Sequence, residues 1–221
     1  MIEVSFKNIS VVPTRHLTYL YPAMKKLLPL LLAAPLLTSQ AQAAGSDALD
    51  PLDPAYNFVG LSYIGGSDGY SAGILDASVA LGRVPYLFAV GTVAGDSDFG
   101  NTDYYGLGIG FRIRTNEVTS LDIDLAYAQQ RQDGYDTNHM FGLGVGFRAA
   151  LGDSWILIAR ARYFVSDLTL VDNVVNYEDF LELSLVASYY VNDRFSIDAG
   201  LRKYIGQNDP FTYSIGGSFH F

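Results

Sequence analysis

The sequence predicts an all-β protein: a transmembrane antiparallel up-and-down β-barrel with ten strands. Three observations support this fold class. Runs of about ten residues alternate between apolar and polar positions, as half-buried strands do. Short and long connections alternate along the chain, and aromatic residues collect near the ends of the runs. An even number of strands joined in this way is typical of membrane-spanning barrels.

A secretory signal is expected before the barrel, over residues 24–43. From Met24 the chain reads as a basic start, an apolar run over 27–37 and the small-residue sequence Ala41-Gln42-Ala43. The apolar run has 11 residues, which is too short for a helix that must cross about 30 Å of bilayer. We therefore predict export with cleavage after Ala43.

Two further segments flank this signal. Residues 1–23 show neither a helical nor a strand period, and we interpret them as an extension from a mis-assigned start. Residues 44–55, "AGSDALDPLDPA", are small, acidic and rich in proline. That composition is typical of a loop, so we expect a flexible periplasmic lead-in there, followed by the barrel over 56–221.

Composition excludes several classes of protein. The chain has 23 acidic and 14 basic residues, a formal net charge of −9, which argues against a nucleic-acid partner. It has no cysteine, and this excludes disulfides and a lipoprotein anchor. No cofactor and no metal are expected.

The last run, "FTYSIGGSFHF", shows the strand pattern most clearly. Its odd-numbered residues from Phe211 to Phe221 are apolar except for Gly217, and its even-numbered residues are polar or small. The first and third strands alternate poorly, so eight strands remain an alternative. In chain order, the same test predicts strands over residues 56–64, 74–83, 86–94, 104–114, 119–130, 138–149, 154–166, 179–190, 194–205 and 211–221.

The connections between these strands fall into two alternating sets. Short turns are expected at 83–85, 115–118, 150–153 and 191–193. Mostly longer loops are expected at 65–73, 95–103, 131–137, 167–178 and 206–210. Short turns at one end and long loops at the other fit a membrane-spanning barrel.

A soluble β-sandwich is the alternative fold, because it also has alternating strands and frequent turns. Mid-strand charges among glycine, alanine and serine favour a narrow polar lumen over an open surface. Aromatic girdles on both sides of an apolar band mark a surface that faces lipid. One girdle is predicted near the short turns (Phe111, Phe147, Tyr189, Tyr190, Phe219, Phe221) and one near the long loops (Tyr104, Tyr105, Phe141, Tyr163, Phe180).

The end of the chain carries a family resemblance. Tyr213, Ile215, Phe219 and Phe221 resemble the C-terminal signal by which outer-membrane proteins are recognised for insertion, although Gly217 interrupts it. With the strand layout, the mature chain resembles small barrels of the OmpA/OmpX class. "YNFVGLSY", "DGYSAG" and "DASVALG" near the start are similar to a family of quorum-factor outer-membrane barrels.

These resemblances imply a location and a set of partners. The location is the outer membrane of a Gram-negative-type envelope, with the long loops facing outward. The partners are outer-membrane lipid, lipopolysaccharide and, during biogenesis, the barrel assembly machinery. The chain is expected to be a monomer.

Charged residues on the polar faces are expected to line the lumen. Arg112 should meet Asp122 across the turn at 115–118, and Glu182 should lie between Arg162 and Arg202. Small barrels fill their interiors with side chains, and unpaired buried charges are costly, so an ion-paired plug is favoured over a charged path for small ions. The predicted lumen charges are Asp76, Arg112, Asp122, Asp124, Arg148, Arg160, Arg162, Glu182, Asp198 and Arg202.

The repeats "YGLGIGFR" and "FGLGVGFR" place a glycine at every second position. A dinucleotide-binding turn has a wider last glycine spacing and leads into a helix. Here the glycines keep period two within a strand, so we interpret them as inward positions that leave room for the lumen arginines.

The long loops are strongly acidic. Within them, "DSDFGNTD" offers oxygen ligands at Asp96, Asp98, Asn101 and Asp103, which a hard cation prefers. The stretch lacks the glycine and glutamate placement of an EF-hand, so a solvated acidic rim is favoured over a cation site.

No catalytic site is predicted. His220 lies at the periplasmic end of the last strand, and His139 lies near the outer rim, directed toward lipid beside Phe141. The acidic pairs of omptin-type proteases are not found. Lys203, on the apolar face near the outer end of its strand, could reach lipid headgroups.

The predicted function is therefore that of an integral outer-membrane barrel with a largely plugged, ion-paired lumen. Its acidic extracellular loops would serve a structural or surface-interaction role. A narrow, porin-like passive channel for small ions or solutes is the alternative.

Overall fold

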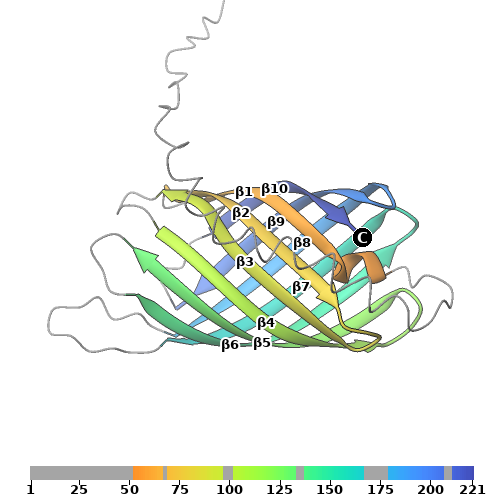
Figure 1. The fold of residues 1–221 in the computed structure, drawn as a ribbon, viewed down its shortest axis with the longest axis horizontal. Coiled ribbons are helices and arrows are strands. Elements are labelled where there is room, and N and C mark those ends of the chain that lie inside the picture. The colour runs from red at the N-terminus through yellow and green to blue at the C-terminus, as the bar shows by residue number, and fades with distance from the viewer. Residues whose placement is uncertain (1–51, 67–68, 97–101, 133–136, 167–178, 207–210) are drawn as a thin grey trace, which may run out of the picture.

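The chain forms a closed antiparallel barrel in which each strand pairs with its neighbours in sequence and β1 closes on β10 (Figure 1). The computed structural model describes residues 52–66, 69–96, 102–132, 137–166, 179–206 and 211–221. The fold class and the count of ten strands are confirmed. The strands are β1 (Phe58–Gly66), β2 (Ser71–Ala80), β3 (Pro85–Asp96), β4 (Thr102–Arg114), β5 (Thr119–Gln132), β6 (Asn138–Leu151), β7 (Trp155–Ser166), β8 (Phe180–Asn192), β9 (Phe195–Ile205) and β10 (Phe211–His220).

Strand parity divides the barrel into an inner and an outer face. Registers such as Phe111↔Ile123 and Phe147↔Ala159 pair odd-numbered residues with odd-numbered ones. Paired residues point to the same side of a sheet, so odd positions face outward and even positions face the lumen. Leu107, Leu143 and Ile215 on the odd face are each at least 58% exposed.

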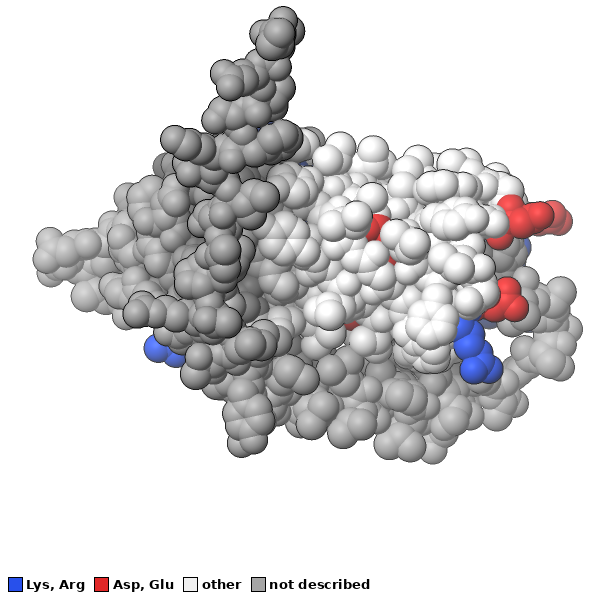
Figure 2. Space-filling view, turned by 90° about the horizontal axis from the view of Figure 1, so that it is seen from above, with Lys and Arg blue, Asp and Glu red and all other residues white. Residues whose placement is uncertain are grey.

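Figure 2 shows the resulting outer surface on one side of the molecule. Uncharged side chains form a broad belt, and charged side chains gather at the end that carries the short turns. This arrangement is the reverse of a soluble sandwich, whose apolar residues face each other. Among the residues that the structure describes, no helix is long and apolar enough to cross a membrane.

Parity corrects three members of the predicted aromatic girdles. Phe180 is buried and packs with Phe164 at a ring-centroid distance of 5.0 Å. Tyr104 packs against the same buried cluster, and Tyr190 packs on a second one. All three are even-numbered lumen residues. Aromatic character alone did not indicate which face they occupy.

Every strand differs from its predicted bounds by one to three residues at one or both ends, and two of these differences lie at the short-turn end near the start of the barrel. β2 ends at Ala80, three residues before the predicted end, because Gly82 adopts a φ of 136°. That angle suits a turn better than a strand, and Leu81 N–H donates to the Pro85 carbonyl across the turn at 2.8 Å. β1 begins at Phe58, two residues later than predicted.

The segment before β1 enters the barrel instead of remaining a free lead-in. Asp53–Tyr56 forms a short 3-10 helix, η3, at the short-turn end (Figure 1). Leu52, Ala55 and Tyr56 are buried against Tyr86 and Ile156. Residues 44–51 lie outside the described ranges. The last residues of the predicted flexible lead-in are therefore packed inside the barrel. They line its opening at the short-turn end, which we call the short-turn mouth.

Candidate functional site

Two rows of charge cross the lumen wall formed by β5, β6 and β7. In one row Asp122 is registered with Gly146, which is registered with Arg160. In the next, Asp124 is registered with Gly144, which is registered with Arg162. Each glycine thus lies between a carboxylate and a guanidinium. At Gly144 the absence of a side chain lets Asp124 occupy the space where a Cβ would lie, whereas a Cβ would fit at Gly146.

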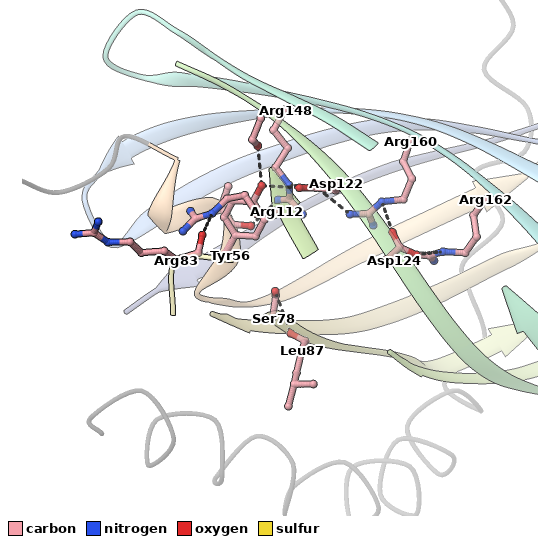
Figure 3. A network of polar contacts seen from close by, with 12 residues as sticks. Tyr56, Ser78, Arg83, Leu87, Arg112, Asp122, Asp124, Arg148, Arg160 and Arg162 are labelled. Carbon is pink, nitrogen blue, oxygen red and sulfur yellow. Dashed lines mark hydrogen bonds and ion pairs between the residues drawn. The ribbon is translucent and has the colours of Figure 1, made fainter. Parts of the chain in front are cut away.

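These rows form a continuous ion-pair ladder (Figure 3). Asp122 Oδ2 lies 2.7 Å from Arg148 Nε and 3.9 Å from Arg160 Nη2. Asp124 Oδ2 lies 3.4 Å from Arg160 Nε, and Asp124 Oδ1 lies 2.8 Å from Arg162 Nη2. Both aspartate side chains are fully buried. Arg160 bridges the two carboxylates, so the four ion pairs act as one network.

Tyr56 of η3 joins this network from the mouth. Its hydroxyl donates to Asp122 Oδ1 at 2.7 Å and lies 2.8 Å from Ser120 Oγ. Arg148 Nη1 donates to the Ala55 carbonyl at 2.6 Å. Burial raises the pKa of the Tyr56 phenol well above its usual range, so the hydroxyl stays protonated and remains a donor.

The Tyr56 ring also lies between two arginines. The guanidinium carbon of Arg148 is 4.1 Å from the ring centroid, and that of Arg112 is 4.6 Å away. Cation–π attraction is strengthened where water is excluded. The ring, the hydroxyl and the preceding carbonyl therefore all hold this segment in the short-turn mouth.

The expected partners of Arg112 and Glu182 are only partly as predicted. Arg112 and Asp122 are registered across the turn, but Arg112 Nε donates to the Arg83 carbonyl at 3.0 Å. The 2.7 Å ion pair of Asp122 is instead with Arg148. Glu182 is registered with Arg162 and lies 4.0 Å from Arg202 Nε.

Asp76 and Asp198 occupy the opposite wall, among small residues. Beside Asp76, a Cβ added at Gly60 would lie 2.5 Å from Oδ1. Asp198 accepts hydrogen bonds from Ser218 Oγ at 2.6 Å and from Ser196 Oγ at 3.0 Å. Five of the ten predicted lumen charges thus form the tightly paired ladder, whereas Asp76 and Asp198 lie on a wall of hydroxyls and glycines.

Ser196, His220 and Asp198 form a constellation that sequence reasoning missed. Ser196 Oγ lies 2.9 Å from His220 Nε2. The single hydroxyl proton of Ser196 goes to Asp198, so His220 donates to the hydroxyl. A general base must accept a proton from its nucleophile, and this arrangement has the opposite direction. Both residues have even numbers and therefore face the lumen, and this was the sequence signal that they could lie close together.

Aromatic clusters lie on both sides of the ladder. Toward the short turns are Tyr56, Tyr86 and Ile156. Toward the long loops, Met140, Phe164 and Phe180 form a second buried cluster with Tyr104 and Tyr204 packed against it. Phe88 contacts both clusters.

The loop predictions fall largely outside the described ranges. Of the weak cation-binding stretch, Asp98 and Asn101 lie outside them, Asp96 is described only in its backbone, and Asp103 belongs to β4. In the parts of the chain that the structure describes, no group of three or more metal-ligating side chains occurs.

The predicted insertion signal lies on the outer face. Tyr213, Ile215 and Phe219 of β10 are 40–59% exposed, and the Phe221 ring lies 6.5 Å from the Phe219 ring. Lys203 is registered with Phe211 on the same face. His139 also faces outward, next to Tyr127.

A closed barrel with an apolar exterior, a charged interior and an outward aromatic C-terminus satisfies the requirements of a spanning sheet, which must leave no open edge in lipid. The chain is an outer-membrane-type β-barrel. No protein-family model matches it, and no curated protein matches it either.

Several solved barrels are similar to this chain in fold. A KdgM porin is 8% identical, with a TM-score of 0.44 over 74% of this chain and 99% of the porin. A NanC porin is 10% identical, with a TM-score of 0.43 over 75% of this chain and all of the porin. The translocator domain of the autotransporter NalP from Neisseria meningitidis is 13% identical, with a TM-score of 0.43 over 89% of this chain and 98% of that domain. At these identities the likeness concerns the fold alone.

Two neighbouring glycines test the role assigned to the repeat on β6. A Cβ at Gly144 would lie 2.5 Å from Asp124 Oδ1, whereas a Cβ at Gly146 meets its nearest atom at 3.4 Å. Asp124 is held by two arginines and cannot move away. We expect Gly144→Ala to lower the free energy of unfolding by about 1–3 kcal/mol through overpacking.

Gly146→Ala is the matched control, on the same strand and face. It should be neutral or stabilising by about 0.5 kcal/mol, because alanine loses less backbone entropy on folding. Urea titration of the folded barrel in detergent, followed by Trp155 fluorescence, measures both. Equal losses of unfolding free energy in the two variants would contradict the conclusion that Gly144 is needed to leave space for Asp124.

Proposed function

We propose that the protein is an outer-membrane barrel whose lumen is closed to ion flow and whose outward-facing loops carry any surface interaction. The observation that carries this proposal is the insertion of Leu52–Tyr56 into the short-turn mouth, where Tyr56 bonds to Asp122. A backbone carbonyl and an aromatic ring occupy the position where an open channel would hold water.

Electrostatics support a stable closure. Four ion pairs compensate the charges of Asp122 and Asp124, and the Tyr56 hydroxyl donates to Asp122. Separating one partner would leave a buried charge uncompensated, at a cost of several kcal/mol. Thermal opening of this ladder is therefore expected to be rare.

Planar-bilayer recording tests the proposal. Folded wild-type protein reconstituted at known orientation should produce no stable single-channel steps. A variant that lacks residues 44–56 should produce at least transient current, because the mouth is then unoccupied. Stable steps from the wild type would overturn the closed-lumen proposal.

A narrow passive channel is the second candidate, and one observation favours it. The side chains of Arg160 and Arg202 are 20% and 31% exposed within the barrel, and the wall near Arg202 consists of residues such as Ser184, Gly200 and Ser214. Under this alternative, the wild type conducts, and its reversal potential in a salt gradient gives the ion preference.

The remaining expectations belong to the same proposal. We expect a monomer, because the barrel closes by pairing β1 with β10 of the same chain. No catalytic role is proposed, because the hydrogen-bond direction at Ser196 does not activate a nucleophile. Signal cleavage after Ala43 would release the lead-in to enter the mouth; N-terminal sequencing of the membrane-extracted protein checks this step.

A further inference from the structure

A polar cluster lies on the outer face of β5 and β6, at the edge of the apolar belt nearest the long loops. Gln129 is registered with His139, and Tyr127 is registered with Phe141. Two residues after Gln129 on β5, and on the same face, Arg131 is exposed. On the membrane side of the cluster, Leu125 and Leu143 are more than half exposed. The cluster therefore begins where the apolar belt ends, at the level of lipid headgroups.

Hydrogen bonds within this cluster fix the histidine. Gln129 Nε2 donates to Tyr127 Oη at 2.8 Å, and Tyr127 Oη lies 2.7 Å from His139 Nδ1. Gln129 Nε2, which can only donate, also lies 3.4 Å from His139 Nδ1, so Nδ1 is the acceptor in this cluster. The ring hydrogen of His139 is therefore on Nε2. Stacking of the two rings at 27° keeps the imidazole in this orientation.

The cluster thus presents two donors at the headgroup level: the guanidinium of Arg131 and the Nε2–H of His139. Asp103 is the registered neighbour of Arg131 on β4 and reduces the local positive charge. Arginine forms paired hydrogen bonds to phosphate oxygens, and imidazole N–H is a compatible second donor. On the membrane side of these donors, the Tyr127 and Phe141 rings form an apolar surface that an acyl chain can contact.

We infer that Arg131 and His139 form a binding site for a phosphate group of a phosphorylated glycolipid in the outer leaflet, with Gln129 and Tyr127 as positioning residues. The site is on the outer surface at the long-loop end, so a lipid-borne phosphate reaches it laterally. It rests on the proposed membrane orientation and is independent of whether the lumen conducts.

Native mass spectrometry of the folded, detergent-solubilised full chain tests the site. The probes are diphosphoryl lipid A, the same lipid without phosphates, phosphatidylglycerol and inorganic phosphate. We expect retention of diphosphoryl lipid A by the wild type, and about tenfold weaker binding for Arg131→Gln and for His139→Leu. Asp103→Asn should bind more tightly, because an opposing charge is removed.

Arg194→Gln is the matched control, since it removes an exposed arginine from the short-turn rim. It should bind like the wild type. Tyr127→Phe keeps the ring but removes the bond to Nδ1, so it should weaken binding less than His139→Leu. Heat-modifiable gel migration verifies that each variant is folded.

Several outcomes would overturn the inference. Equal retention of dephosphorylated lipid A would show that acyl chains alone determine binding. Equal retention of phosphatidylglycerol would show a site for any anionic lipid, and displacement by low concentrations of inorganic phosphate would show a site for the free ion. A loss in Arg194→Gln as large as that in Arg131→Gln would show a nonspecific charge effect.

Discussion

Replacing Asp122 by alanine is expected to lower the free energy of unfolding by about 3–5 kcal/mol, the typical cost of breaking a buried ion pair. Asp122 accepts from Tyr56 and lies 2.7 Å from Arg148 Nε. Its removal leaves the buried Arg148 guanidinium without this carboxylate. Urea titration with Trp155 fluorescence measures the loss.

Two controls accompany this variant. Asp122→Asn keeps the shape and one acceptor, so its loss should be smaller than that of the alanine variant. Asp153→Ala removes an exposed carboxylate from a turn and should stay within about 0.5 kcal/mol of the wild type. If Asp122→Ala resembled Asp153→Ala, the ladder would not contribute to stability.

Tyr56→Ala is expected to be the second large effect, with a loss of about 3–5 kcal/mol, as for other buried aromatic truncations. The ring is fully buried and lies between two arginines. Its removal also leaves Ser120 and Asp122 without their shared partner. The same urea titration, performed in parallel, provides the measurement.

Tyr56→Phe separates the ring from the hydroxyl. It keeps the packing and loses the hydrogen bonds to Ser120 and Asp122, so a smaller loss of about 1–3 kcal/mol is expected. Equal losses for the phenylalanine and alanine variants would mean that the ring does not contribute packing in the mouth.

Most of the lumen could be predicted because a strand has a period of two. Once Phe111 and Phe147 are assigned to lipid, Asp122, Asp124, Arg160 and Arg162 must face inward. Short turns then determine which strands are neighbours. Side-chain pairing is less constrained. The sequence indicated Arg112 for Asp122, whereas Arg148, which is registered with Ser120 on the other side of β5, supplies the 2.7 Å ion pair.

The rest could not be predicted because it depends on contacts between distant segments. Nothing local in "DPLDPAY" indicates that Tyr56 binds residues on β5; its composition indicates a loop. Leu52 and Tyr56, two large apolar residues in a polar stretch, were the available signal. Phe180 and Tyr104 show a second limit, since an aromatic residue near a strand end suits a girdle and a lumen cluster equally.

The insertion of η3 has a consequence for the order of assembly. Tyr56 contacts residues 64 and 66 positions later in the chain, and Ala55 contacts one 93 positions later. Its docking site does not exist until β5 and β6 are paired, although η3 precedes all ten strands in the chain. Contacts of such sequence separation form slowly. We therefore expect η3 to take its final place after these strands have paired, and a bulky group fused before residue 52 to slow this last step without changing the strands.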